Sequence, residues 1–154
     1  MSDFINHLQE RSAQGGYGVF GTLDIEIKSA SSGQVSLAIK PDGWAALHDD
    51  EPTVHSGLLT LLLDSIFGFA VISSLETPTA IATIDLKIDF LRDVPVAEKL
   101  LVEARVVDAP DVFAHTEGEV REQKTGLLIA RGNGSFMVGT KGPSFSTTNP
   151  EVTP

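Results

Sequence analysis

The sequence contains no cysteine, and it has few basic residues for its length. The absence of cysteine excludes disulfides and thiolate chemistry and fits a reducing compartment, so we expect a cytoplasmic protein. The 11 lysines and arginines are outnumbered by 21 acidic residues, which gives a formal net charge of −10. Such a charge repels phosphate backbones, so we expect no nucleic-acid partner. It also opposes any anionic ligand unless cations cluster locally.

Features of an exported or membrane-spanning chain are also missing. The first 16 residues carry acids and have neither the basic flank nor the apolar core of a secretory signal. The one long apolar stretch, 58–75, is interrupted by Asp64 and lies among strand-like segments, so we expect no membrane span.

At 154 residues, of which 42% are hydrophobic, the chain fits one domain with its own core. We expect three parts: an N-terminal helix or tail at 1–16, a folded domain at 17–139, and a disordered tail at 140–154 that is rich in Ser, Thr and Pro.

Alternating apolar and polar residues predict six strands. Two of them, at 19–28 and 34–39, form a hairpin around a Ser-Ser-Gly turn, and the other four lie at 83–90, 99–107, 112–122 and 127–138. The clearest alternation is in 83–90, which predicts a half-buried strand. Its two faces carry Ile84, Leu86, Ile88 and Phe90 on one side, and Thr83, Asp85, Lys87 and Asp89 on the other.

Between these two groups of strands, Ser56 is predicted to cap a helix that continues to residue 74. Nearly every side of this helix is apolar, so it must be covered on all sides as the central buried element. Near the end of the chain, Ala130, Gly132 and Gly134 share one strand face. Such small residues either let a helix cross the sheet closely or mark a bulge or bend, and the sequence alone does not choose.

The element order therefore predicts an α+β fold with one long helix held against one antiparallel sheet. The opposite face of the sheet is then solvated or paired with another subunit, and a symmetric dimer is the expected oligomer.

The segment VHSGLLTLLLDSIFG combines a histidine, a helix start and a carboxylate. At a helix start the first N–H groups lack intrahelical partners, so the amides of Ser56 and Gly57 can hold a carbonyl oxygen or an oxyanion. His55 beside them is either part of this site or a capping residue.

Asp64 is the only charged residue of this helix. A carboxylate in apolar surroundings costs free energy unless it is paired, and desolvation suits it to general-base catalysis; a structural, hydrogen-bonded Asp is the alternative. Asp64 lies roughly 12 Å along the axis from the helix start, so the two cannot act on one carbonyl within one chain. An antiparallel helix pair across a dimer would bring them together.

These residues resemble the PaaI-like hotdog thioesterases over residues 32–138. The resemblance rests on His-Ser-Gly, on Asp64 nine positions after the histidine, and on TIDLKIDFLR at 83–92. It implies a hotdog fold, a homodimer or homotetramer with its sites at the dimer interface, and neither metal nor cofactor. The implied substrate is an acyl-CoA or a related thioester.

The resemblance also implies roles for individual residues. Asp64 would act as general base or nucleophile, the Ser56 amide would polarise the carbonyl with Gly57 beside it, and Thr83 would orient the attacking water. His55 would help to hold the substrate carbonyl or the leaving sulfur. Phosphate contacts are expected from Arg92, Lys87 or Arg131, of which Arg92 is the candidate substrate-binding residue.

The sequence departs from the family pattern, Asn-x-x-Gly-x-x-His-Gly-Gly, at three positions. Ser56 replaces the first glycine after the histidine, Pro52 replaces the earlier glycine, and Asp49 replaces the asparagine that contacts the substrate. An ionised Asp49 cannot donate the hydrogen bond of an amide.

The sequence thus leaves three functional hypotheses. The main one is a thioesterase, the alternative is a non-catalytic hotdog protein that binds an acyl or aromatic ligand, and a hotdog dehydratase comes last.

Overall fold

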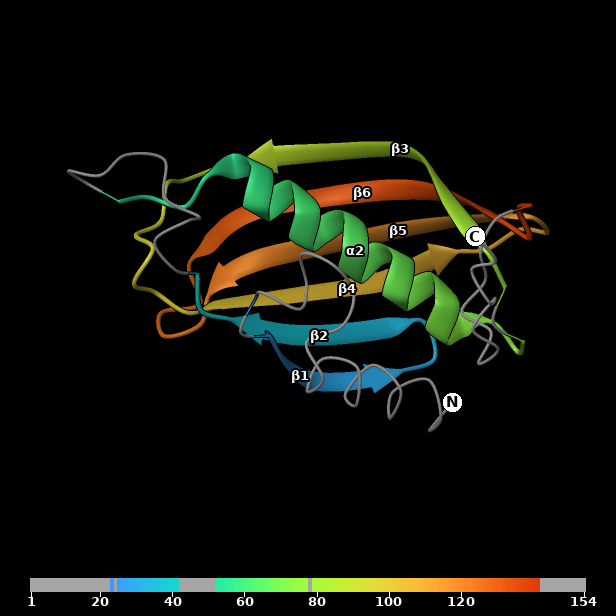
Figure 1. The fold of residues 1–154 in the computed structure, drawn as a ribbon, viewed down its shortest axis with the longest axis horizontal. Helices are drawn as coiled ribbons and strands as arrows, with labels where there is room; N and C mark the ends of the chain where they lie inside the picture. The colour runs from blue at the N-terminus through green and yellow to red at the C-terminus, as the bar shows by residue number, and fades with distance from the viewer. Residues whose placement is uncertain (1–22, 24, 42–51, 78, 142–154) are drawn as a thin grey trace, which may run out of the picture.

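The computed structural model describes residues 23, 25–41, 52–77 and 79–141. They form one six-stranded antiparallel sheet and one helix, in the sheet order β1-β2-β4-β5-β6-β3 (Figure 1). The elements are β1 (Ile25–Ser31), β2 (Gln34–Ile39), α2 (Ser56–Ser74), β3 (Ile81–Phe90), β4 (Leu100–Asp108), β5 (Phe113–Glu122) and β6 (Leu128–Val138). The expected order of two strands, one helix and four strands is confirmed.

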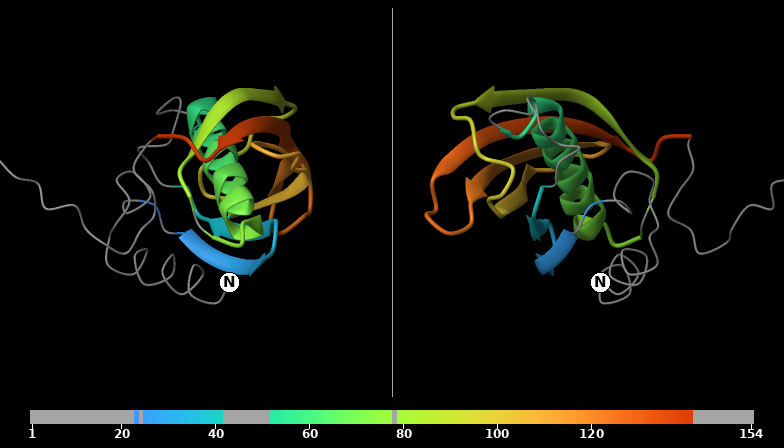
Figure 2. Two further views of the ribbon diagram at one scale, coloured as in Figure 1. Left: turned by 90° about the vertical axis from the view of Figure 1, so that its right-hand side faces the viewer. Right: turned by 60° about the vertical axis from the view of Figure 1, so that its left-hand side comes forward.

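Helix α2 lies diagonally across one face of the sheet, and the sheet curves around it (Figures 1 and 2). By length and composition alone α2 could cross a membrane, but more than half of it is buried within the protein. Its apolar side chains form the centre of the core, as a helix that is apolar on nearly every side requires. The fully buried ones include Leu62, Leu63, Ile66, Phe67 and Val71.

The sheet residues that face α2 lie in continuous rows across neighbouring strands. One row joins Leu37 on β2, Val102 on β4 and Val120 on β5, and all three side chains are buried. Residues between these rows point to the opposite side, which we call the outer face. The pairing register therefore separates an apolar inner face from a charged outer face.

Small residues on the inner face make room for Phe67 of α2. A Cβ added to Gly118 would lie 2.7 Å from the Phe67 ring, and one added to Gly134 would lie 3.1 Å from it. The ring thus rests directly on the backbones of β5 and β6. The glycines in 127–138 therefore allow the close approach of helix and sheet, which was one of the two interpretations. They do not mark a bulge between β5 and β6, because the register shift of that pair lies between Val120 and Arg121.

Strand β3 has a bulge that the sequence pattern did not predict. Thr83 pairs with Phe136 of β6, whereas Asp85 pairs with Ser135, so that Ile84 has no partner of its own. Residues paired directly across strands point to the same side, so Thr83 points toward α2 with the buried Phe136. The predicted faces were therefore wrong at these two positions: Thr83 lies on the inner face, and Ile84 is 52% exposed.

The end of α2 is fastened to the β1–β2 turn by Ser73. Its buried hydroxyl oxygen accepts the amide of Gly33 at 3.1 Å and lies within 3.0 Å of the carbonyls of Ser31 and Ala70. Gly33 has φ +74°, a conformation that glycine adopts at little cost. This contact fixes the direction of the helix relative to the sheet.

Strand boundaries agree with the sequence prediction to within one residue for β4, β5 and β6, and β2 matches it fully. The predicted first strand, 19–28, ends three residues too early, because β1 continues to Ser31, and residues 19–22 and 24 lie outside the described residues. Thr140, in the predicted tail, donates its amide to Ala80. The predicted N-terminal helix and residues 142–154 of the predicted tail lie outside the described residues.

Candidate active site

The start of α2 is capped by His55 and not by Ser56, which corrects the sequence prediction. His55 has extended backbone angles, and its Nδ1 accepts the amide of Gly57 at 2.8 Å. Ser56 is therefore the first residue of the helix. Its own amide has no acceptor among the described residues.

Two short backbone segments hold this helix start in place. The amide of Val54 donates to Val94 at 2.9 Å, and the amide of Val96 donates to Pro52 at 3.0 Å. The side chains of Val54, Val94 and Val96 are buried. The helix start is thus fixed on its inner side, while His55, Ser56 and Gly57 remain exposed to a ligand.

Asp64 and Thr83 meet between α2 and β3. The hydroxyl of Thr83 donates to Oδ1 of Asp64 at 3.0 Å. This contact requires the bulge, because regular alternation from Asp85 would turn Thr83 to the outer face. Asp64 is partly exposed, and its second oxygen, Oδ2, has no hydrogen-bond partner among the described residues.

One chain does not bring the helix start and Asp64 together. Asp64 lies eight positions after Ser56 in the regular helix α2, which corresponds to roughly 12 Å along its axis. The described residues therefore form two half-sites: His55, Ser56 and Gly57 at the helix start, and Asp64 with Thr83 near the middle of α2.

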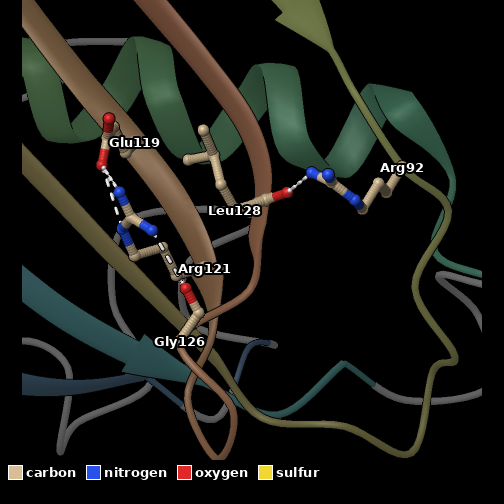
Figure 3. A network of polar contacts seen from close by, with 5 residues as sticks. All are labelled: Arg92, Glu119, Arg121, Gly126 and Leu128. Atoms are coloured by element: carbon tan, nitrogen blue, oxygen red, sulfur yellow. Dashed lines mark hydrogen bonds and ion pairs between the residues drawn. The ribbon is translucent and has the colours of Figure 1, made fainter.

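Of the two predicted substrate-binding residues, the structure describes only Arg92. Asp49 lies outside the described residues. Arg92 follows the end of β3 and is exposed, and one of its guanidinium nitrogens donates to the carbonyl of Leu128 at 2.7 Å (Figure 3). That bond ties the end of β3 to the start of β6 and leaves the other guanidinium N–H groups available to a ligand.

Each of the three guanidinium nitrogens of Arg121, drawn in the same view, donates to a protein group. It donates twice to Glu119 and once to the carbonyl of Gly126 at 2.9 Å (Figure 3). It therefore stabilises the β5–β6 turn and has little capacity left for a ligand.

Lys87 and Arg131, the other two expected phosphate contacts, lie on the outer face. Both form ion pairs with Asp89, at 3.2 and 3.3 Å. The hydrogen bond and the charge of Lys87, with a smaller contribution from Arg131, hold the pKa of Asp89 below its usual value. These two cations are thus on the side of the sheet opposite Asp64 and are already paired.

A depression of about 740 Å³ lies over these residues on the outer face. Its lining includes the pairs of Lys87 with Asp89 and of Arg105 with Glu117. It contains neither of the half-sites, and its cations are compensated by carboxylates. The candidate site is therefore the one at α2 and β3, where unpaired donors and an available carboxylate oxygen occur.

Within the described ranges, no group of three or more His, Asp and Glu side chains is arranged to bind a metal. Four apolar side chains of α2 and of the residue after β3 differ in their burial. Phe67 is fully buried core, Leu61 and Phe69 are partly buried against the core, and Leu91 is 42% exposed. Only the last three are placed to contact a ligand or a second subunit.

One feature of the site was missed by the sequence prediction: the bulge at Ile84, for which the sequence carries no local signal. The capping role of His55 was one of the two alternatives for that residue, and the structure confirms it.

Comparison with known proteins shows the family of this chain. The model of the thioesterase superfamily matches residues 51–129, about half of the chain, including both half-sites. A protein of Halobacterium salinarum that is named as an esterase is 35% identical over 131 residues, which cover 79% of this chain and 85% of that protein.

Two solved structures share the fold. The PaaI protein of the Escherichia coli phenylacetic acid degradation operon superposes with a TM-score of 0.73 at 21% identity, over 85% of this chain and 91% of that one. A hypothetical thioesterase protein of Streptococcus pneumoniae, crystallised with coenzyme A, gives a TM-score of 0.67 at 21% identity, over 75% and 85%. The hotdog fold expected from the sequence is confirmed, and the chain belongs to the thioesterase superfamily.

Proposed function

We propose that this protein hydrolyses the thioester bond of an acyl-CoA to give the free acid and coenzyme A. The observation that carries the proposal is the hydrogen bond from Thr83 to Asp64, which holds one carboxylate oxygen and leaves the other available. Family membership supports thioester hydrolysis, and the coenzyme A in the S. pneumoniae relative supports the choice of thiol.

In this mechanism Asp64 accepts a proton from water while the water oxygen attacks the carbonyl carbon. The negative charge that develops on the carbonyl oxygen is stabilised by the unpaired amide of Ser56 and by the positive end of the helix dipole. The C–S bond then breaks, and the departing thiolate takes up the proton from Asp64. Direct attack by Asp64, followed by hydrolysis of the anhydride, is the second route.

We further propose that each site is shared between two chains, with Asp64 of one facing the Ser56 amide of the other. The separation of the two half-sites within one chain supports this arrangement. Strand β3 is an edge of the sheet, and it carries the exposed apolar side chains of Ile84 and Phe90. An exposed apolar edge strand is typical of a surface that pairs with another chain.

The first test measures thiol release from short, medium, long and aromatic acyl-CoAs. The parent protein should release thiol from at least one of them, and Asp64→Asn should abolish turnover without changing the melting temperature by more than a few degrees. Stabilisation of the parent by acyl-CoA without any thiol release would favour the non-catalytic binding protein. A single turnover in ¹⁸O-labelled water separates the two routes, because only the nucleophilic route transfers label to Asp64.

The second test asks whether the site is shared. Ser56→Pro removes one amide N–H at the first helical position, where proline is well tolerated, and the His55 angles of φ −63° and ψ 132° suit a residue before proline. Ser56→Pro and Asp64→Asn should each be inactive. After mixing and subunit exchange, a shared site predicts recovery of about a quarter of the parental rate, because half of the dimers then hold one intact site. No recovery after verified exchange contradicts the shared site.

Arg92 is proposed to contact the phosphates of coenzyme A. Arg92→Gln should raise KM for an acyl-CoA but not for the matching acyl-pantetheine, which lacks the nucleotide phosphates. Lys87→Gln, on the outer face, is the matched control and should change neither KM. An equal effect of Arg92→Gln on both substrates would assign Arg92 to the structural bond with Leu128 alone.

A further inference from the structure

Among the glycines of the described residues, Gly68 on α2 is the one that the fold itself does not explain. Three others have positive φ angles, which glycine adopts at little cost, and at four more an added Cβ would come to 3.1 Å or less from a neighbouring atom. The first group is Gly33, Gly126 and Gly139, and the second is Gly57, Gly118, Gly132 and Gly134. Gly68 belongs to neither group.

An alanine would fit at position 68 without a clash. Gly68 has no positive φ angle, and a Cβ built on it would lie 3.5 Å from Cδ1 of Ile81 and 3.9 Å from Cε1 of Phe136. Both are ordinary van der Waals distances. Glycine inside a helix is less favourable than alanine. The glycine therefore lowers stability without a compensating contact among the described residues, and such a conflict is typical of a functional position.

The unfilled position lies beside the proposed catalytic carboxylate. Gly68 follows Asp64 by four residues, so the two share one face of α2, about 6 Å apart along the helix axis. Ile81 and Phe136 border the space over Gly68. Phe136 pairs with Thr83, the residue that donates to Asp64. An apolar space thus begins next to the hydrogen-bonded carboxylate and continues over Gly68.

The helix itself indicates in which direction a substrate chain can extend. Helix α2 crosses the sheet diagonally, so after Asp64 it moves away from β3 (Figure 1). Before Asp64, the same face carries the side chains of Thr60 and Leu61. The Thr60 hydroxyl donates to the carbonyl of Ser56 at 3.0 Å, and Leu61 is partly buried against the core. A chain that leaves a carbonyl at Asp64 therefore has room toward Gly68 and not toward the helix start.

We propose that the acyl chain of the substrate extends from Asp64 over Gly68, and that the missing side chain at this position limits which acyl groups are accepted. The inference rests on the proposed thioesterase function and assigns a specificity-determining residue to it. An extended chain advances roughly 1.2 Å per bond, so about five bonds separate the carbonyl carbon from the level of Gly68. The acyl chain therefore reaches Gly68 at about its sixth carbon.

The first test compares Gly68→Ala with the parent on acetyl-, butanoyl-, hexanoyl- and octanoyl-CoA. One methyl group in an apolar pocket changes kcat/KM by about 10- to 200-fold, so the variant should lose at least about tenfold on the two longer substrates. On acetyl-CoA it should stay within about threefold of the parent, because that chain ends before Gly68. Ser74→Ala, at the end of α2, also raises helix propensity and should keep the parental rates. An equal loss on all four substrates, or a parental profile in Gly68→Ala, would contradict the inference.

Stability and assembly separate this role from a structural one. Because alanine fits at position 68 and favours the helix, Gly68→Ala should raise the melting temperature by about 3 °C. Light scattering should give the same oligomeric state as for the parent. A lower melting temperature, or dissociation into smaller species, would overturn the inference, because the glycine would then serve the fold or a contact between chains.

Binding provides a readout that does not depend on turnover. S-octyl-CoA and S-ethyl-CoA are thioethers, which the enzyme cannot hydrolyse. Gly68→Ala should weaken the binding of S-octyl-CoA about tenfold and leave that of S-ethyl-CoA unchanged, and equal affinities in variant and parent would refute the role of Gly68. Failure of the parent to release thiol from any acyl-CoA would contradict the proposed function. Thiol release with the same chain-length preference in parent and variant would overturn this inference alone.

Discussion

Replacing Thr83 with valine removes one hydroxyl and leaves the shape of the side chain nearly unchanged. The hydroxyl donates to Asp64 at 3.0 Å, across the contact between β3 and α2. A hydrogen bond to a charged group contributes about 1.5–3 kcal/mol, and the exposure of Thr83 in the single chain places this one near the lower value. Since 1.36 kcal/mol corresponds to a factor of ten in rate, Thr83→Val should lower kcat roughly tenfold.

The assay is thiol release at saturating acyl-CoA, with Thr83→Ser as the matched control. Serine keeps the hydroxyl, so its kcat should remain within about threefold of the parent. Because Thr83 acts through Asp64, the valine change should have no further effect on whatever rate remains in Asp64→Asn. A parental kcat in Thr83→Val, or a tenfold loss that persists in the Asp64→Asn background, would refute the view that Thr83 positions the carboxylate.

Three further predictions concern the fold and the outer face. Gly118→Ala should lower the free energy of unfolding in urea by about 3 kcal/mol, because its Cβ would overlap the backbone oxygen of Glu103. Ser73→Ala should cost about 1–3 kcal/mol in the same measurement, because the buried amide of the β1–β2 turn loses its acceptor. Lys87→Gln should raise the pKa of Asp89 in an NMR titration. The folded-state pKa of Asp89 is lowered, so the stabilisation by this pair is present at neutral pH and is lost as the pH falls through that pKa.

Most of the fold could be predicted from the sequence because its signals are local. The turn residues at 108–111 and 124–126 and the alternation within 99–138 locate β4, β5 and β6 to within one residue. Helix α2 could be predicted from its apolar length, and its central position followed from the lack of a polar side. Each of these arguments uses only neighbouring residues and the period of the element.

The helix cap shows a case in which the sequence offered two neighbouring residues, Ser56 and His55, and the structure selects the second. Serine is a frequent cap and histidine is a rare one, so propensity favoured Ser56 over His55. The ring can cap because Gly57 leaves space for it, and that space is a property of the three residues together. Single-residue preferences do not contain this information.

The bulge in β3 shows why the site itself could not be derived from periodicity. Strict alternation in 83–90 places Thr83 with Asp85 and Lys87 on the outer face, away from Asp64. Phe136 of β6 faces the core and Ser135 faces outward, and the bulge lets Thr83 pair with the first and Asp85 with the second, while Ile84 stays unpaired. The hydroxyl reaches the carboxylate only because the strand breaks its own period there, as bulges beside active sites commonly do. The strand pattern therefore gave the wrong face for Thr83, because pairing with a distant strand, not local alternation, sets the direction of this side chain.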